Sequence, residues 1–193
     1  MHRNDDDPAS AEGPGRLRGA IETPHLTLRP CLPEQLLALI DRPEDFERLV
    51  GLPLAEGLHG YYASADVSHD WLDALRGAAQ PDPWLHGFFV VPRDTPSVIG
   101  SAGFKGPPDS DGMVEIAYGI VPGFEGRGYA TEAAAALVRF AFASERVRLV
   151  RAHTLPVANA SSRVLRKCGF RHAGSVVDPD DGPVWRWERG PLP

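Results

Sequence analysis

Three glycines in six residues, Gly123, Gly126 and Gly128, join an apolar run to a long alanine-rich run. We expect the apolar run, residues 113–121, to form a strand, and the alanine-rich run to form a helix over about residues 127–143. The first N–H groups of a helix have no partner within it, and the helix dipole makes this end positive. Glycines there let a ligand reach the backbone directly, because they carry no side chain. The bend is therefore predicted to bind phosphate.

The spacing of the glycines argues against two common phosphate sites. A nucleotide-triphosphate loop needs G-x-x-x-x-G-K followed by Ser or Thr, and a dinucleotide fold needs G-x-G-x-x-G with an acidic residue about twenty positions later. Residues 126–130 instead read G-x-G-x-A. A plain turn between strand and helix explains one glycine but not three. We therefore favour a cradle built from backbone N–H groups.

Two segments resemble one known family. Residues 121–132, VPGFEGRGYATE, resemble the loop with which the GNAT acyltransferases bind the pyrophosphate of acetyl-CoA, and residues 159–170, NASSRVLRKCGF, resemble the second cofactor segment of that family. The branch that they resemble contains the ribosomal-protein N-terminal (alanine) acetyltransferases, and the resemblance covers about residues 24–188. It implies an α/β fold with a mixed, mostly antiparallel central sheet flanked by helices. One parallel strand pair in that sheet is expected to splay apart.

The resemblance also implies acetyl-CoA as cofactor, without a metal. The implied cofactor-binding residues are Ile120, Val121, Glu125, Gly126, Arg127, Gly128, Tyr129, Ala130, Thr131, Asn159, Ser162 and Arg166. A backbone N–H near Ile120 or Val121 is expected to hold the thioester carbonyl. Two positions depart from the family pattern: Glu125 stands where Gln or Arg is usual, and Leu165 stands where many relatives carry a tyrosine general acid. Backbone N–H groups must then carry the pyrophosphate binding, and the leaving thiolate needs another acid.

The strand before the bend offers a candidate catalytic base. A period of two places Glu115 on the same face as Ala117 and Gly119, where small residues leave room for a ligand. An alkyl ammonium, with a pKa near about 10, must lose a proton before it attacks a thioester. Glu115 is the predicted acceptor of that proton. The alternative is that Glu115 points to solvent or pairs with an arginine.

Ser162 is the candidate general acid. On the resemblance it lies near the thioester sulfur, where its hydroxyl can hydrogen-bond the departing thiolate. The alternative is local, because Asn159 is a natural helix cap and Ser162, three residues later, can bond the same turn.

The expected acceptor is a primary amine, either a protein N-terminus or a small molecule. In the resembled fold, residues 58–66 lie over the acceptor mouth, which makes Tyr61, Tyr62 and Asp66 candidate substrate contacts. His153, in the strand after the long helix, either faces the same cleft or is a satisfied structural histidine. We expect direct transfer in a ternary complex. The alternative function is a catalytically weak acyl-CoA-binding module that acts as a sensor or binds a partner.

Composition limits the remaining possibilities. A chain of 193 residues with 42% apolar residues suits one domain, expected for residues 21–193, and the Asp, Pro, Gly and Ser content of residues 1–20 predicts a disordered extension. The net charge of −6 argues against nucleic-acid binding through broad electrostatics. Cys31 and Cys168 form neither a disulfide framework nor a metal-binding pattern, and no apolar run has the length of a signal peptide or membrane span. We expect a cytoplasmic monomer or homodimer without membrane or nucleic-acid partners.

Overall fold

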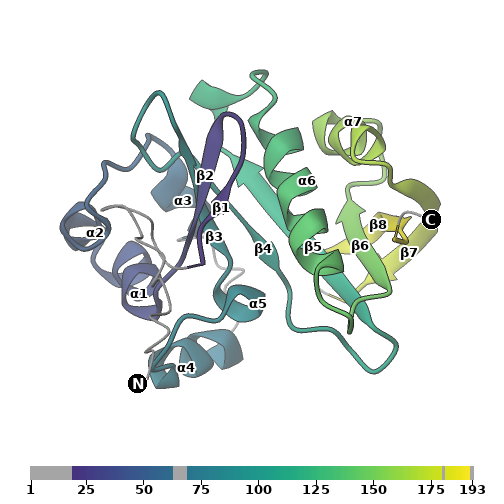
Figure 1. Ribbon diagram of the computed structural model, residues 1–193, viewed down its shortest axis with the longest axis horizontal. Coiled ribbons are helices and arrows are strands. Elements are labelled where there is room, and N and C mark those ends of the chain that lie inside the picture. Colours follow the sequence, from purple (N-terminus) through teal and green to yellow (C-terminus); the bar gives the residue numbers. More distant parts are fainter. Residues whose placement is uncertain (1–18, 63–68, 180, 192–193) are drawn as a thin grey trace, which may run out of the picture.

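A computed structural model describes residues 19–62, 69–179 and 181–191. Within them, eight strands form one sheet in the order β1-β2-β3-β4-β5-β6-β8-β7. The strands are β1 (Ile21–Glu22), β2 (Leu26–Pro30), β3 (Phe88–Pro92), β4 (Gly100–Phe104), β5 (Met113–Ile120), β6 (Leu149–Thr154), β7 (Arg171–Asp178) and β8 (Gly182–Arg189). All neighbouring strands are antiparallel except β5 and β6. The predicted fold class is therefore confirmed (Figure 1).

Helices cover both faces of this sheet. They are α1 (Pro33–Asp41), α2 (Pro43–Val50), α3 (Leu58–Tyr62), α4 (His69–Gly77), α5 (Pro83–His86), α6 (Tyr129–Phe142) and α7 (Ala160–Lys167), with a 3-10 turn, η1, at Pro122–Phe124. On one face, Phe140 of α6 packs against Phe88 of β3, with ring centroids 5.6 Å apart. On the other face, Phe46 of α2 packs against Phe89, at 5.3 Å. Because neighbouring strand residues point to opposite faces, β3 is buried on both sides.

The parallel pair of strands diverges in the middle of the sheet. β5 and β6 pair only through Met113–Glu115 and Leu149–Arg151, although β5 continues to Ile120 and β6 to Thr154. Each strand stays paired on its other side, β5 with β4 and β6 with β8. The gap between the unpaired parts of β5 and β6, which we call the splay, therefore has Glu115 at its closed end. This is the divergence that the sequence predicts.

One short helix, α3, lies in a segment whose sequence pattern predicts no helix. Residues 58–66 show no convincing helical period, yet Leu58–Tyr62 form α3. A helix of five residues is too short to display a periodic pattern, and its first residue, Leu58, joins the core at 2% exposure. None of the described helices is long and apolar enough to cross a membrane.

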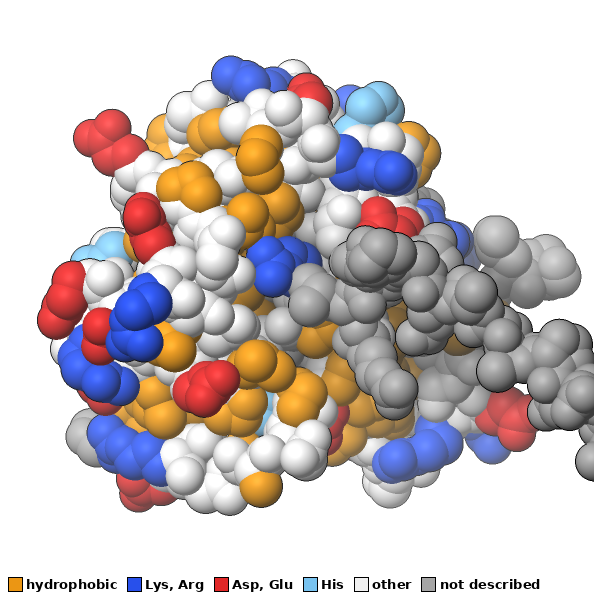
Figure 2. Space-filling view, turned by 60° about the vertical axis from the view of Figure 1, so that its left-hand side comes forward, with side chains coloured by type: hydrophobic (Ala, Val, Ile, Leu, Met, Phe, Trp, Pro, Cys, Tyr) orange, Lys and Arg blue, Asp and Glu red, His pale blue; other side chains and the backbone are white. Residues whose placement is uncertain are grey.

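Surface charge is mixed on the side of the molecule shown in Figure 2. Over the described part of this face, Lys and Arg side chains are interspersed with Asp and Glu rather than gathered into one patch. Hydrophobic side chains lie between them.

Candidate functional site

The glycine-rich bend leads directly into α6. Gly126 and Gly128 have φ values of 74° and 86°, which favour glycine, and a Cβ at either position would meet no atom within 4 Å. Gly128 is the N-cap residue, and no described side chain caps the helix. The helical ladder begins where the Glu132 N–H donates to the Gly128 carbonyl at 3.0 Å. Three N–H groups precede that ladder, those of Tyr129, Ala130 and Thr131.

The two charged side chains of the bend are both exposed. Arg127 is held beside it, because its Nη2 donates to the Gly123 carbonyl at 3.2 Å and its guanidinium lies 5.0 Å from the centre of the Phe124 ring. Glu125 is tied by its backbone, whose N–H donates to the Pro122 carbonyl at 3.2 Å. The cation of Arg127 can therefore offset the acid of Glu125 for an anionic ligand.

The open edge of β5 carries backbone donors for the splay. The Val121 N–H donates to the Ile99 carbonyl, and the Lys105 N–H donates to the Glu115 carbonyl, both at 2.9 Å. Odd-numbered residues of β5 thus bond to β4, and even-numbered residues point to the other edge. Of the two donors considered for a thioester carbonyl, Ile120 directs its N–H into the splay. The Val121 N–H is already engaged within the sheet.

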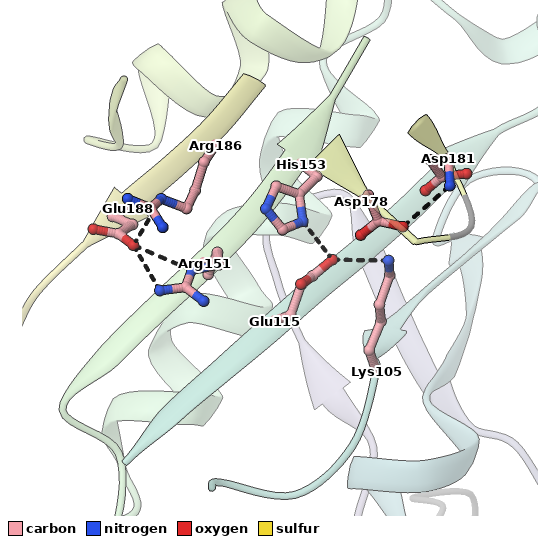
Figure 3. A network of polar contacts seen from close by, with 8 residues as sticks. All are labelled: Lys105, Glu115, Arg151, His153, Asp178, Asp181, Arg186 and Glu188. Carbon is pink, nitrogen blue, oxygen red and sulfur yellow. Dashed lines mark hydrogen bonds and ion pairs between the residues drawn. The ribbon is translucent and has the colours of Figure 1, made fainter. Parts of the chain in front are cut away.

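Glu115 forms the centre of a polar network at the closed end of the splay (Figure 3). Its Oε1 lies 2.9 Å from Lys105 Nζ and 3.1 Å from His153 Nδ1. The side chain of Glu115 is 14% exposed and that of Lys105 is 48% exposed. Burial lowers the pKa of Lys105, but the hydrogen bond to Glu115 and the charges of Glu115, Asp178 and Asp181 outweigh burial and raise it. Glu115 is therefore paired, with a lysine and a histidine rather than an arginine.

His153 reaches this network from β6. A carboxylate oxygen only accepts hydrogen bonds, so His153 Nδ1 carries the proton of its contact with Glu115. The other ring nitrogen, Nε2, is buried and has no hydrogen-bond partner among the described residues. In a neutral ring this nitrogen is an acceptor. His153 thus lies beside Glu115, while its contact with a substrate stays a prediction.

A second cluster of ion pairs continues the same face of the sheet. Arg151 lies opposite Glu115 on β5 and opposite Glu188 on β8. Its Nη2 is 2.8 Å from Glu188 Oε1, and Arg186 Nε is 3.4 Å from the same oxygen. The arginine charges on this face are therefore directed to Glu188, and Lys105 is the cation that contacts Glu115.

The N-terminus of α7 satisfies its own donors. The Ser162 N–H donates to Asn159 Oδ1 at 2.8 Å, and the Asn159 N–H donates to Ser162 Oγ at 3.0 Å. The Ser162 hydroxyl donates in turn to the Asn159 carbonyl at 2.9 Å, and Ser162 is fully buried. The capping alternative is thus what the structure shows for both residues. A role for Ser162 as an acid would require its hydroxyl to leave this cap.

Of the remaining predicted residues, the structure describes the surroundings of Arg166 but not those of Tyr61, Tyr62 and Asp66. Arg166 is exposed and lies 5.0 Å from the centre of the Trp187 ring. Tyr61 and Tyr62 end α3, but their side chains are outside what the structure describes, and Asp66 lies outside the described residues altogether.

Three polar residues near the site have no role in the sequence-based prediction. Lys105 is one: it follows β4 directly, in a hairpin with β5, and the register of that hairpin brings it beside Glu115. Glu132 is another: it accepts the His25 N–H at 2.8 Å and lies 3.0 Å from His25 Nδ1, so it ties the first turn of α6 to β2. The third is Tyr118, whose buried hydroxyl has no partner among the described residues. Burial raises the pKa of Tyr118, which keeps its phenol neutral.

A hollow of about 480 Å³ lies elsewhere, between α4 and α5. Its lining includes Trp71, Leu75 and His86 and none of the predicted site residues. We therefore place the site at the bend and the splay, where the donors converge.

The chain is similar to known proteins both in sequence and in fold. The sequence matches the model of the acetyltransferase (GNAT) domain family over residues 25–171. It is 33% identical over 89 residues to an uncharacterized N-acetyltransferase, YjdG, of Bacillus subtilis, a match that covers 46% of this chain and 51% of that protein. The chain spans about half the length of the curated relatives it matches.

Solved acetyltransferases share the fold. RimL, a ribosomal L7/L12 α-N-protein acetyltransferase in complex with coenzyme A, superposes with a TM-score of 0.59 at 17% identity, covering 89% of this chain and 97% of that one. The aminoglycoside acetyltransferase AAC(6′)-Ib, also in complex with coenzyme A, gives a TM-score of 0.56 at 20% identity, covering 86% and 94%. At these identities the likeness establishes a common fold.

Proposed function

The chain belongs to the GNAT acetyltransferase family, and we propose that it moves an acetyl group from acetyl-CoA to a primary amine by direct transfer in a ternary complex. The observation that carries this proposal is the uncapped N-terminus of α6 behind two glycines of positive φ, at the open end of the splay. Acetyl-CoA supplies the acetyl group as a thioester.

The bend has the properties that a diphosphate site requires. Its glycines leave open space at Gly126 and Gly128, and the N–H groups of Tyr129, Ala130 and Thr131 are not used by the helical ladder. These donors and the helix dipole favour an anion without any cationic side chain. Residues Glu125 to Thr131 would hold the pyrophosphate, and the Ile120 N–H would hold a carbonyl oxygen in the splay.

Glu115 is the proposed proton acceptor for the incoming amine. It lies at the closed end of the splay on the face that also presents Ala117, which is exposed. A carboxylate there can take the proton that an alkyl ammonium must lose before attack. His153 would hold this carboxylate in place through Oε1. Positioning of the two substrates is expected to supply most of the remaining rate.

The leaving thiolate needs a proton donor other than a tyrosine at position 165, which is the buried Leu165. Ser162 is the proposed donor if its hydroxyl leaves the Asn159 carbonyl during the reaction. A thiolate with a pKa near about 8.5 can also be protonated by water, so a strong acid is not needed.

The acceptor is proposed to be a protein N-terminus or a small-molecule amine. Both classes are represented on this fold, by the names of RimL and of the aminoglycoside acetyltransferase. A second candidate function, a binding module with little turnover, is favoured by one observation. Lys105 already occupies the Glu115 oxygen that an acceptor amine would use.

Thiol release from acetyl-CoA, measured against a panel of peptides and small amines, tests the enzyme. Glu115→Gln should lower kcat by about 100-fold while the Kd for CoA changes less than about twofold. Glu188→Gln is the matched control, because it removes a carboxylate of the same face that pairs with Arg151 instead. CoA binding without turnover on any amine would support the binding module. No CoA binding at all would refute both functions.

A further inference from the structure

A hollow of about 460 Å³ lies where α7 ends, between α6 and the ends of β7 and β8. Three of the side chains that line it are cationic, those of Lys167, Arg171 and Arg189, and no acidic side chain of the described residues lines it. In Figure 1, α7, β7 and β8 lie on the same side of α6. The volume is in the range of small-molecule sites, about 300–1,000 Å³. We call this site the cationic hollow.

The cations of this hollow have no acidic partners. Within the described residues, none of the three pairs with a carboxylate. Arginines elsewhere do pair with Asp or Glu, among them Arg42, Arg48, Arg76, Arg93, Arg151 and Arg186. Carboxylates are not scarce in a chain whose net charge is −6. Because like charges repel, three cations around one hollow are unfavourable until an anion enters it.

Helix capping accounts for only part of this charge. Cations favour the C-terminus of a helix, where unpaired carbonyls make the helix dipole negative. The last carbonyls of α7 already accept the backbone N–H groups of residues 168–170, and Arg189 donates to the carbonyl of residue 168. The side chains of Lys167 and Arg171 are exposed and have no hydrogen-bond partner among the described residues. Their donors are therefore available to a ligand.

The cationic hollow adjoins the first turns of α6. Cys168 lines the hollow, and its thiol donates to the Thr131 carbonyl at 3.4 Å. Burial raises the pKa of Cys168, whereas the charges of Arg189 and Arg139 act in the opposite direction. The positive field thus extends to the buried side of the hollow. Ala135, which also lines it, follows Thr131 by four residues, or about 6 Å along the helix.

We infer that the cationic hollow binds a phosphate group. Phosphate oxygens accept charge-assisted hydrogen bonds, and Lys and Arg are the side chains that recognise them. Lys167 comes from α7 and Arg171 from β7, so the two approach the hollow from different elements. Arg189 has further N–H donors besides the one that it uses at the end of α7. This inference does not depend on the proposed acetyl transfer.

Two sources of such a phosphate group share this chemistry. CoA carries a phosphate on its ribose in addition to its diphosphate, and the hollow lies about one helical turn beyond the last donor of the bend, Thr131. The other source is a separate phosphate compound that binds without CoA. Both sources require the same cations, and the experiment below distinguishes them.

Backbone amide shifts in ¹H–¹⁵N NMR spectra of the full chain, titrated with inorganic phosphate, test the inference. Gly169 and Gly190 line the hollow and report on it separately from the glycines of the bend. Their shifts should saturate with phosphate and should not follow sodium chloride at equal ionic strength. Lys167→Gln and Arg171→Gln should each weaken this binding by at least about fivefold.

Arg76→Gln is the matched control, because it removes the same charge from an exposed arginine that pairs with Asp73 on α4. It should change phosphate affinity by less than about twofold. The inference is overturned if phosphate shifts only the glycines of the bend. Equal shifts in chloride, or affinity that neither hollow variant lowers, would overturn it too.

Dephospho-CoA, which lacks the ribose phosphate, separates the two sources. If CoA supplies the group, Lys167→Gln and Arg171→Gln should each lower affinity for CoA by at least about fivefold and for dephospho-CoA by less than about twofold. If a separate compound supplies it, the two cofactors should bind equally and inorganic phosphate should still shift Gly169 in the CoA complex.

The proposed function is judged separately, at the bend. Phosphate binding in the hollow without any CoA binding would support this site and refute the acetyltransferase. CoA binding at the bend, with no response of Gly169 and Gly190 to CoA or to inorganic phosphate, would refute the site and leave the enzyme standing.

Discussion

The N-termini of α6 and α7 offer a comparison between two similar positions that are built differently. Each helix follows the open end of one diverging strand, α6 after β5 and α7 after β6. The first helix begins at Gly128 without a side-chain cap, whereas the second begins at Asn159 with a reciprocal cap between Asn159 and Ser162. The donors of α6 are thus left for an external group, and those of α7 are satisfied within the chain.

The difference suggests one role for each predicted cofactor segment: ligand binding at the α6 end and stability at the α7 end. An uncapped helix end costs stability unless water or a ligand satisfies it, and retaining one beside two glycines of positive φ favours ligand binding. A capped end gives stability and fixes the direction of the chain. We therefore expect changes at the α6 end to alter affinity for CoA more than stability, and changes at the α7 end to do the reverse.

Gly128→Val is expected to have the largest effect. A residue with φ of 86° is strained by about 1–2 kcal/mol with any side chain and more with a β-branched one, and the new side chain would enter the space left for the ligand. Titration calorimetry should show at least a roughly 30-fold loss of affinity for CoA. Unchanged affinity would mean that the α6 end is not where the diphosphate binds.

Ser162→Ala tests the capped N-terminus of α7. Loss of the hydroxyl should lower the free energy of unfolding by about 1–2 kcal/mol, because it is fully buried and makes two hydrogen bonds of the cap. Chemical denaturation measures this change, and affinity for CoA should fall by less than about threefold if capping is the main role. A drop in kcat far beyond the loss of folded protein would instead support Ser162 as the acid.

Glu132→Gln examines how α6 is positioned without a cap. Burial raises the pKa of Glu132, but hydrogen bonds from Thr23 and His25 outweigh it and lower the pKa below its ordinary value of about 4.3. The charged form is therefore favoured in the folded state, and its stabilisation is present above that value and lost as pH falls through the lower folded-state pKa. Denaturation at pH 7 should show the variant less stable by about 1 kcal/mol, with the difference vanishing in acid. A difference that persists in acid would point to packing rather than charge.

Gly123→Ala should have the smallest effect and serves as the control for Gly128. This glycine belongs to the same bend, but its φ is not positive and a Cβ there would meet no atom within 4 Å. Stability should change by less than about 0.5 kcal/mol and affinity for CoA by less than about twofold. A loss comparable to that of Gly128→Val would show that the bend tolerates no side chain anywhere, and that positive φ is not the reason.

The bend could be predicted from sequence because its chemistry lies in the backbone. Glycine is the residue that adopts positive φ without strain, so the spacing of Gly126 and Gly128 exposes the local geometry directly. The parallel pairing of β5 and β6 could be predicted as well, since a strand, a helix and a second strand require it, whereas the splay of this pair was expected from the family resemblance. The cap at Asn159 also follows from local sequence, as Ser162 lies three residues away.

The network at Glu115 could not be predicted in the same way, because it depends on register. Lys105 is ten residues from Glu115 in sequence, and only the length of the turn between β4 and β5 brings the two side by side. His153 depends on the pairing of β6 with β5, two strands that α6 separates in sequence. Period two places Glu115 on the correct face, but it does not identify the residues of neighbouring strands that share that face.

The splay also affects how fast individual backbone amides of the sheet should exchange their hydrogens with solvent. Amides in the middle of a sheet usually exchange slowest, because both edges of each strand are protected. The N–H groups of Tyr118 and Ile120 belong to a central strand but point into the gap beyond the last β5–β6 pair. They should exchange as quickly as those of an outer strand, and a molecule filling the gap would slow them. A central strand of this sheet therefore behaves as an edge until a ligand takes the place of its missing neighbour.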